Sequence, residues 1–349
     1  IIDLEPGIEE HLIILTTHDT FPSKDFGQIM SGSKNPILLI VDEVHGIGSP
    51  QRRYGLIERY DYRLGLSATP RRWFDPEGTE ALFKYFDKTV YEFPLNKAIG
   101  KYLIQYEYHP HFVSLTSDEF EAYERETKKI AKAYYVAQDD NEREEWYTLL
   151  CIRRQKIVKT AYNKYNILRQ VIDRNKDIKH CLVYCAPEQI ESVQNILLEN
   201  NIIQHKFTQV EGTRPLKEYG GLSEREYLLQ QFSKGTIQVL VAMKCLDEGV
   251  DIPPARFAIM MSNSGNPREY IQRRGRILRR HPGKKIAVIH DIIVTPTHMY
   301  LKDSDLANLE KKIFNREIIR YKEFAFLANN VVECYRKIEE LEERYGRWR

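Results

Sequence analysis

The stretch that most constrains the fold is residues 37–45, which reads Ile-Leu-Leu-Ile-Val-Asp-Glu-Val-His. Its apolar run, Leu38 to Val41, ends abruptly in two acidic residues. The run is too short to cross a membrane, and it suits a strand buried on both faces of a parallel sheet. Because ligands bind at the carboxyl ends of such strands, Asp42 and Glu43 are expected to emerge where chemistry gathers.

Two adjacent carboxylates at a strand end can perform different tasks. The first can hold Mg²⁺ through its water shell, and the second can orient or deprotonate an attacking water. The alternative is a core strand that ends in an ordinary solvated Asp-Glu pair. This stretch alone does not decide between the two interpretations.

Composition indicates a soluble globular protein. The chain has 349 residues, 42% hydrophobic and 29% charged, which is enough for two domains. No apolar run is long enough to span a bilayer and no signal peptide is visible, so we expect no membrane partner. The five cysteines form no CxxC pair, and Cys181 and Cys185 are interpreted as core residues. This cysteine usage fits a reducing, cytoplasmic location.

The pattern of elements predicts an α/β fold with two parallel-sheet domains. Residues 1–115 are assigned to the first domain because short strand candidates alternate there with helix-length spacers. These candidates lie at residues 12–15, 38–41, 62–66 and 89–93. Residues 116–175 begin with a capping-box pattern and contain neither Gly nor Pro, which predicts a helical connector. A thumb that contacts nucleic acid is the alternative for this stretch.

A second α/β domain is predicted over residues 176–297. Its strands are expected at residues 181–185, 237–242, 257–261 and 286–289, and its helices at 189–199 and 223–232. Residues 298–349 are predicted to form a helical C-terminal tail, because charged residues recur at i,i+4 spacing. This tail is either a supporting arm or a partner-binding helix.

Several motifs then resemble those of the superfamily-2 helicases, which are built from two RecA-like domains. The stretches 42–45 (Asp-Glu-Val-His), 67–69 (Ser-Ala-Thr) and 272–279 (Gln-Arg-Arg-Gly-Arg-Ile-Leu-Arg) resemble motifs II, III and VI. Residues 182–186 and 246–253 look like motifs IV and V. The resemblance covers about residues 10–295. Within the superfamily, residues 65–72, 75–78 and 91–95 look similar to bacterial DEAD/DEAH-like proteins related to XPB and to restriction-type helicases.

The resemblance implies a role for each residue of the first domain. Asp42 would bind Mg²⁺, Glu43 would position the hydrolytic water, and His45 would link the nucleotide site to the second domain. The hydroxyls of Ser67 and Thr69 would couple the ATP site to the nucleic-acid face. Thr16 and Thr17 sit where the family carries a motif that contacts nucleic acid, motif Ib.

The sixth motif supplies the basic residues of the second domain. Gln272, Arg276 and Arg279 recur at helical spacing, and the two arginines are expected to share a helix face. Guanidinium groups match the charge that phosphoryl transfer spreads over the γ-phosphate, so both are candidate arginine fingers. Gln272 is assigned to the nucleotide and Arg273 to nucleic acid. The alternative is a solvated basic helix, or a helix that binds nucleic acid without catalysis.

The fifth motif and the start of the chain depart from the family pattern. Gly249 would allow close backbone approach to the nucleotide, and Asp251 resembles the residue that bonds the ribose. Met243 replaces a frequent Thr and cannot donate a hydrogen bond to a phosphate. No G-x-x-x-x-G-K-[ST] loop occurs in residues 1–41, which begin without Met. We therefore expect a fragment whose first RecA-like domain is truncated and which by itself binds ATP poorly.

These features predict an ATP-dependent helicase or translocase that uses ATP and Mg²⁺ and acts on DNA rather than RNA. Repair, restriction and defence are the expected settings, and a nuclease or effector domain or subunit is an expected partner. Two alternatives stay open. One is an RNA-directed helicase or remodeller, and the other is a nucleic-acid-binding module that lacks ATPase activity.

Overall fold

A computed structural model describes residues 12–72, 75–134, 141–208, 210–242, 252, 254–263, 267–295, 315 and 317–345. The chain divides into two compact units, residues 1–92 and 93–349, and each unit is described by itself. The sequence placed the first boundary at residue 115 instead. No described helix is both long and apolar enough to cross a membrane.

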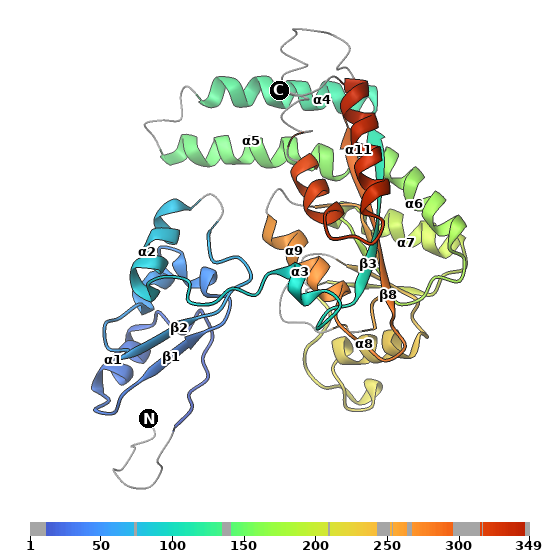
Figure 1. The fold of residues 1–349 in the computed structure, drawn as a ribbon. Helices are drawn as coiled ribbons and strands as arrows, with labels where there is room; N and C mark the ends of the chain where they lie inside the picture. The colour runs from blue at the N-terminus through green and yellow to red at the C-terminus, as the bar shows by residue number, and fades with distance from the viewer. Residues whose placement is uncertain are drawn as a thin grey trace. The chain divides into compact units, whose positions relative to one another are not determined.

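The first unit is built on a small parallel sheet. Strand β1 (Leu38–Val41) pairs in parallel with β2 (Tyr62–Gly65), with Leu38 opposite Tyr62 and Val41 opposite Gly65. Helices α1 (Lys24–Gly32) and α2 (Pro76–Phe86) belong to the same unit (Figure 1). Two 3-10 turns, Val44–Gly48 and Arg52–Gly55, lie between the strands in sequence. The predicted strands at 38–41 and 62–66 are therefore confirmed.

Only one face of this sheet is covered by the described residues. Val41, Val44, Ile47, Tyr60 and Leu82 form its buried core. The other face carries apolar side chains that remain exposed by 39–66%, namely Leu38, Ile40, Tyr62 and Leu64. The expectation that β1 is buried on both faces is wrong for the described part of the chain, because the helices and turns of this unit cover one side.

Two further strand predictions in the first unit are wrong. Residues 12–15 and 89–93 adopt no strand conformation, although both runs are apolar. A strand needs a neighbour for its backbone N–H and C=O groups. Among the described residues of this unit, β1 and β2 pair only with each other. Apolar composition alone therefore gave a false signal.

The second unit contains a six-stranded parallel sheet in the order β3-β8-β7-β4-β6-β5. Four predicted strands are confirmed: β4 (Cys181–Tyr184), β6 (Val239–Ala242), β7 (Phe257–Met260) and β8 (Ile286–Thr295). Sequence reasoning missed β3 (Gln105–Ser114) and β5 (Gln204–Phe207). Strand β3 pairs with β8 along its whole length, so residues 105–114 join the second sheet.

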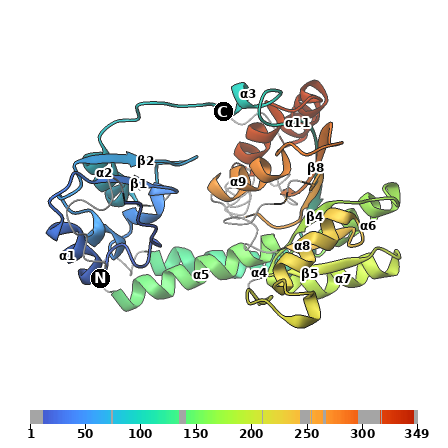
Figure 2. The same ribbon diagram turned by 90° about the horizontal axis from the view of Figure 1, so that it is seen from below.

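Helices cover both faces of this sheet (Figures 1 and 2). One core packs α6 (Asn163–Arg174) and α7 (Ile190–Glu199) against residues such as Val183 and Val241. The opposite core packs α8 (Glu224–Lys234), α9 (Pro267–Ile277) and C-terminal residues against Tyr184 and Met260. This two-sided covering explains why β4 and β6 are buried at every position.

The predicted helical connector is helical. Thr116 and Glu119 exchange the two hydrogen bonds of a capping box, at 2.9 and 3.3 Å, before helix α4 (Ser117–Tyr134). Helix α5 (Asn141–Lys159) lies beside α4, and their far ends project from the sheet (Figures 1 and 2). A short helix, α3 (Leu95–Ala98), precedes β3.

The C-terminal segment is part of the core of the second unit. Tyr321, Phe324 and Cys334 are fully buried against the sheet, and helix α11 (Val331–Tyr345) adds Ile338 and Leu341. Asn330 bonds both the backbone N–H and the backbone C=O of Tyr108 at 2.9 Å. The described part of the tail is therefore a structural layer of the domain.

Helix α8 offers a direct test of these local assignments. The Ser223 hydroxyl accepts from the backbone N–H of Glu226, and the Glu226 carboxylate accepts from the backbone N–H of Ser223. We expect Ser223→Ala to destabilise α8 by about 1 kcal/mol, because one buried cap is lost. Hydrogen exchange of the α8 amides measures this effect. Ser233→Ala, at an exposed position of the same helix, is the control and should leave exchange unchanged.

Candidate functional site

The candidate site of the first unit is built on the turn that follows β1. Leu66 donates its backbone N–H to Val41, and Val44 donates its own to Leu66, which ties this turn to the end of β2. Glu43 adopts a left-handed conformation, with φ 47° and ψ 47°. This conformation is uncommon for a residue other than glycine and is often found at functional sites. The strand end therefore holds Glu43 in a defined, strained position.

His45 joins the two predicted motifs of this unit. Its side chain is buried, and its Nδ1 atom lies 3.0 Å from Ser67 Oγ in a hydrogen bond. The same nitrogen lies 3.3 Å from Glu43 Oε2. Acid, imidazole and hydroxyl thus form one connected chain of side chains across the strand ends.

Thr69 lies next to the Glu43–His45–Ser67 group of side chains. Its backbone N–H donates to Ser67 Oγ at 3.1 Å. Its own hydroxyl oxygen is buried and makes no hydrogen bond within the described residues. A buried hydroxyl without a partner costs free energy, so its retention fits a role in contacting another group.

Asp42 is the candidate cation ligand. It is exposed, and its Oδ1 atom accepts the backbone N–H of Glu43 at 2.9 Å. Among the described residues, no group of three or more His, Cys, Asp or Glu side chains could hold a metal ion. A single exposed carboxylate nevertheless fits Mg²⁺, which keeps most of its waters and binds protein through one or two carboxylates.

Two neighbouring residues escaped the sequence reasoning. His18 Nε2 donates to the carbonyl oxygen of Asp42 at 2.9 Å, and Arg72 donates to the carbonyl oxygen of His45. Arg72 also bonds Asp75 Oδ2 at 2.7 Å. The Gly78 N–H, and then Arg72, hold the pKa of Asp75 below its ordinary value. Both residues brace the backbone of the acidic turn, and only tertiary contact reveals this.

Thr16 and Thr17 are exposed and lie just before this bracing histidine. Thr17 Oγ1 accepts the backbone N–H of Thr20 at 3.2 Å, so it caps a local turn. Their assignment to nucleic acid stays a prediction.

Helix α9 of the second unit carries the sixth motif. Arg273 is only 4% exposed; its guanidinium donates to the Ser262 carbonyl at 2.8 Å and to Asn263 Oδ1 at 3.2 Å. It also lies over the Tyr184 ring, 4.8 Å from the centroid. The assignment of Arg273 to nucleic acid stays a prediction, but these contacts give the side chain a structural role.

The two candidate arginine fingers do not share a helix face. Helix α9 ends at Ile277, and the backbone carbonyl of Leu278 accepts a hydrogen bond from the backbone N–H of Ile104 at 2.9 Å. Arg279 forms an isolated bridge with Leu103 and is exposed, whereas Arg276 is only 9% exposed. The predicted helical pairing is wrong because the segment before β3 draws the chain out of the helix. Gln272 is half-buried on α9.

The fifth-motif residues Gly249 and Asp251, and Met243 before them, lie outside the described residues. Their assigned contacts with the nucleotide and nucleic acid stay predictions.

A buried polar network behind α9 was also missed. Asp291, at 0% exposed, accepts from Tyr108 Oη at 2.9 Å and from Asn263 Nδ2 at 3.1 Å. Arg320 donates two hydrogen bonds to the same carboxylate, at 3.0 and 3.1 Å. Burial, reinforced by the Asp291 charge, raises the pKa of Tyr108 well above its ordinary value. The network connects Arg273, through Asn263, to the C-terminal segment.

A second link runs between α9 and the C-terminal segment. Arg274 is 1% exposed and donates at 2.7 Å to both the backbone and the carboxylate of Glu323. Its guanidinium also lies 5.0 Å from the centroid of the Phe324 ring. Helix α9 is therefore held against the C-terminal segment, and Arg274 makes the contacts between them.

Comparisons with known proteins match both units. The family model described as the helicase conserved C-terminal domain matches residues 163–281. The DNA 3'-5' translocase XPB2 of Sulfurisphaera tokodaii is 29% identical over 330 residues, which cover 86% of this chain and 68% of that protein. The DNA 3'-5' helicase XPB of Mycobacterium tuberculosis is 23% identical over 79% of this chain and 42% of its own length.

A third relative is the putative DNA 3'-5' helicase Rad25 of Haloarcula marismortui. It is 26% identical over 243 residues, which cover 69% of this chain and 33% of that protein. The chain thus spans about two thirds of the first of these relatives and less than half of the other two.

Proposed function

We propose that this chain is the motor portion of an ATP-dependent DNA translocase or helicase of superfamily 2, because it is similar to XPB-type proteins and matches the helicase conserved C-terminal domain. The observation that carries the proposal is the connected chain of Glu43, His45 and Ser67 beside Asp42. It joins two motifs that are 22 residues apart in sequence at the carboxyl ends of parallel strands, where nucleotides bind.

The proposed roles combine the motif resemblance with the contacts within each unit. Asp42 would hold a hydrated Mg²⁺, and Glu43 would orient the attacking water, with His45 beside the Glu43 side chain. Bound ATP and Mg²⁺ would supply the phosphoryl group and a cation for its charge. Arg276 and Arg279 would supply positive charge for the phosphoryl oxygens. Ser67 and Thr69 transmit the state of the site, since the Thr69 hydroxyl is available to another partner.

DNA is the proposed nucleic-acid substrate, because the three relatives above are named as acting on DNA. Contacts mostly to phosphates would make the grip on DNA independent of sequence and sensitive to salt. A role in repair, restriction or defence, an effector partner and a cytoplasmic location are further parts of this proposal.

The test is ATP hydrolysis by the intact protein in the presence of single-stranded DNA, duplex DNA or RNA. We expect DNA to stimulate turnover and RNA to have little effect. Stimulation by RNA alone would favour the RNA-directed alternative. Binding of DNA without any stimulated hydrolysis would favour a binding module.

A further inference from the structure

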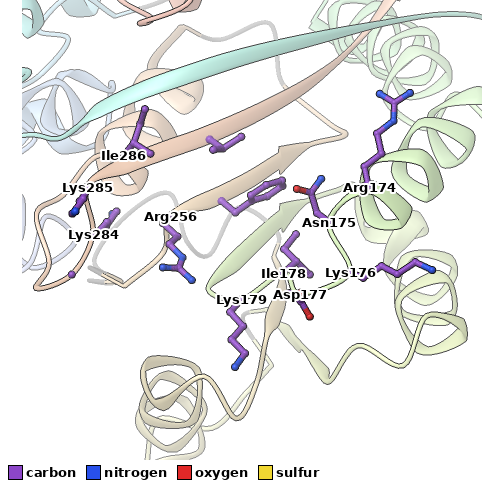
Figure 3. Close-up of a pocket in the computed structure, with 13 residues that line it drawn as sticks. Arg174, Asn175, Lys176, Asp177, Ile178, Lys179, Arg256, Lys284, Lys285 and Ile286 are labelled. Atoms are coloured by element: carbon purple, nitrogen blue, oxygen red, sulfur yellow. The ribbon is translucent and has the colours of Figure 1, made fainter.

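A second site lies at the amino ends of the strands in the large sheet. A cavity of about 560 Å³ is formed by three segments: the turn between α6 and β4, the start of β7, and the start of β8. Figure 3 shows Lys179, Arg256 and Lys284 gathered around this end of the strands. Strands β6 and β7 end at Ala242 and Met260, at the opposite, carboxyl edge of the sheet.

The cavity lining is strongly basic. It contains six Lys or Arg residues and one acid, Asp177, whereas the whole chain has a net charge of only +2. The cationic residues are Arg174, Lys176, Lys179, Arg256, Lys284 and Lys285. In the part of the chain that the structure describes, all but Lys284 are exposed, and these five form no ion pair with a carboxylate. Like charges held around one concavity raise the local positive potential and attract anions.

Two titratable groups beside the cavity have lowered pKa values, and burial is the largest cause for both. Burial lowers the pKa of Lys284 to about 8, and its Nζ atom donates to the Arg279 carbonyl at 2.8 Å. The pKa of His180 is lowered by burial, and the charges of Arg256 and Lys179 add to this effect. One wall of the cavity thus contacts the backbone of a candidate arginine finger.

We propose that this cavity binds phosphate groups of nucleic acid at a second contact outside the motor motifs. The inference rests on the proposed function, which brings DNA to this chain. Flexible lysine and arginine side chains suit phosphate oxygens, which accept hydrogen bonds from any direction. The contact is to phosphates and not to bases, since the one aromatic ring in the lining, Phe257, already stacks on His290 at 4.9 Å.

An acidic protein segment fits the cavity less well. Tight peptide binding uses apolar anchors in pockets or pairing with a free strand edge. Here Ile178 is buried in the core, and Val288 and Phe257 lie in strands whose neighbours already pair with them. The cavity would therefore bind a ligand mainly through its positive charge.

The experiment measures DNA binding by the intact protein, without nucleotide, as a function of salt concentration. A triple variant, Lys176→Gln, Lys179→Gln and Arg256→Gln, is compared with the natural protein. We expect affinity to fall about tenfold or more, and the slope of log affinity against log salt to decrease by about 2–3. The matched control, Lys97→Gln, Lys217→Gln and Lys234→Gln, removes the same charge at exposed positions outside the cavity and should keep the slope.

Equal slopes for the two triple variants would overturn the proposal, because net charge alone would then explain binding. Competition with tripolyphosphate and with polyglutamate separates the sources of negative charge. Selective loss of tripolyphosphate or polyglutamate binding, with DNA binding unchanged, would also overturn it. ATP hydrolysis at saturating DNA is measured separately, and its absence in the natural protein would contradict the motor function. The slopes of log DNA affinity against log salt would still test the cavity.

Discussion

We expect replacement of Glu43 by Gln to abolish DNA-stimulated ATP hydrolysis in the intact protein, with turnover falling by about 10²–10⁴-fold. The amide keeps the size of the side chain but cannot accept a proton from the attacking water. Glu43 Oε2 lies 3.3 Å from His45 Nδ1, and Gln keeps the same number of side-chain heavy atoms at this position. Steady-state phosphate release measures the effect.

Glu58→Gln is the matched control for this substitution. Glu58 is an exposed acid of the same unit that pairs with Arg63 at 2.8 Å, and its loss should leave turnover unchanged. DNA binding should survive in both variants. If Glu43→Gln retains its turnover, Glu43 does not activate the water.

The second large effect concerns stability. We expect Arg320→Ala to lower the local free energy of unfolding around β8 by about 3–5 kcal/mol, because it leaves the Asp291 carboxylate buried without its charged partner. Burial by itself would lower the pKa of Arg320, but the charges of Asp291 and Glu317 raise it above its ordinary value. Native-state hydrogen exchange of the β8 amides in the intact protein gives this free energy.

Two comparisons make this stability test specific. Arg169→Ala removes an exposed pair with Glu199 at 3.9 Å and should cost about 0–1 kcal/mol. The double variant Asp291→Asn with Arg320→Met should cost less than Arg320→Ala, since no buried charge is then left alone. A loss below about 1 kcal/mol for Arg320→Ala would show that the pair is not a structural centre.

Elements with strong local patterns were predictable. The strands β1, β4, β6 and β7 are short apolar runs with clear boundaries, β8 begins with such a run, and the Thr116 and Ser223 caps carry their own signals. The missed strand β3 has no long apolar run, because polar residues and a proline interrupt it: Glu107, His109, Pro110, His111 and Ser114. It becomes a strand because β8 provides a ten-residue partner. The run at 12–15 is the opposite case, since it is apolar but finds no described partner.

The site divides in the same way. The sequence by itself determined which residues stand at the strand ends, because a strand that stops at Val41 places Asp42 and Glu43 there in any parallel sheet. Only the tertiary structure decided three features. His18 and Arg72 donate hydrogen bonds to the backbone of the acidic turn. The Arg273 side chain is buried, and Arg279 lies beyond the end of α9. These depend on contacts between distant segments, and periodicity within a segment carries no information about the neighbour that it will meet.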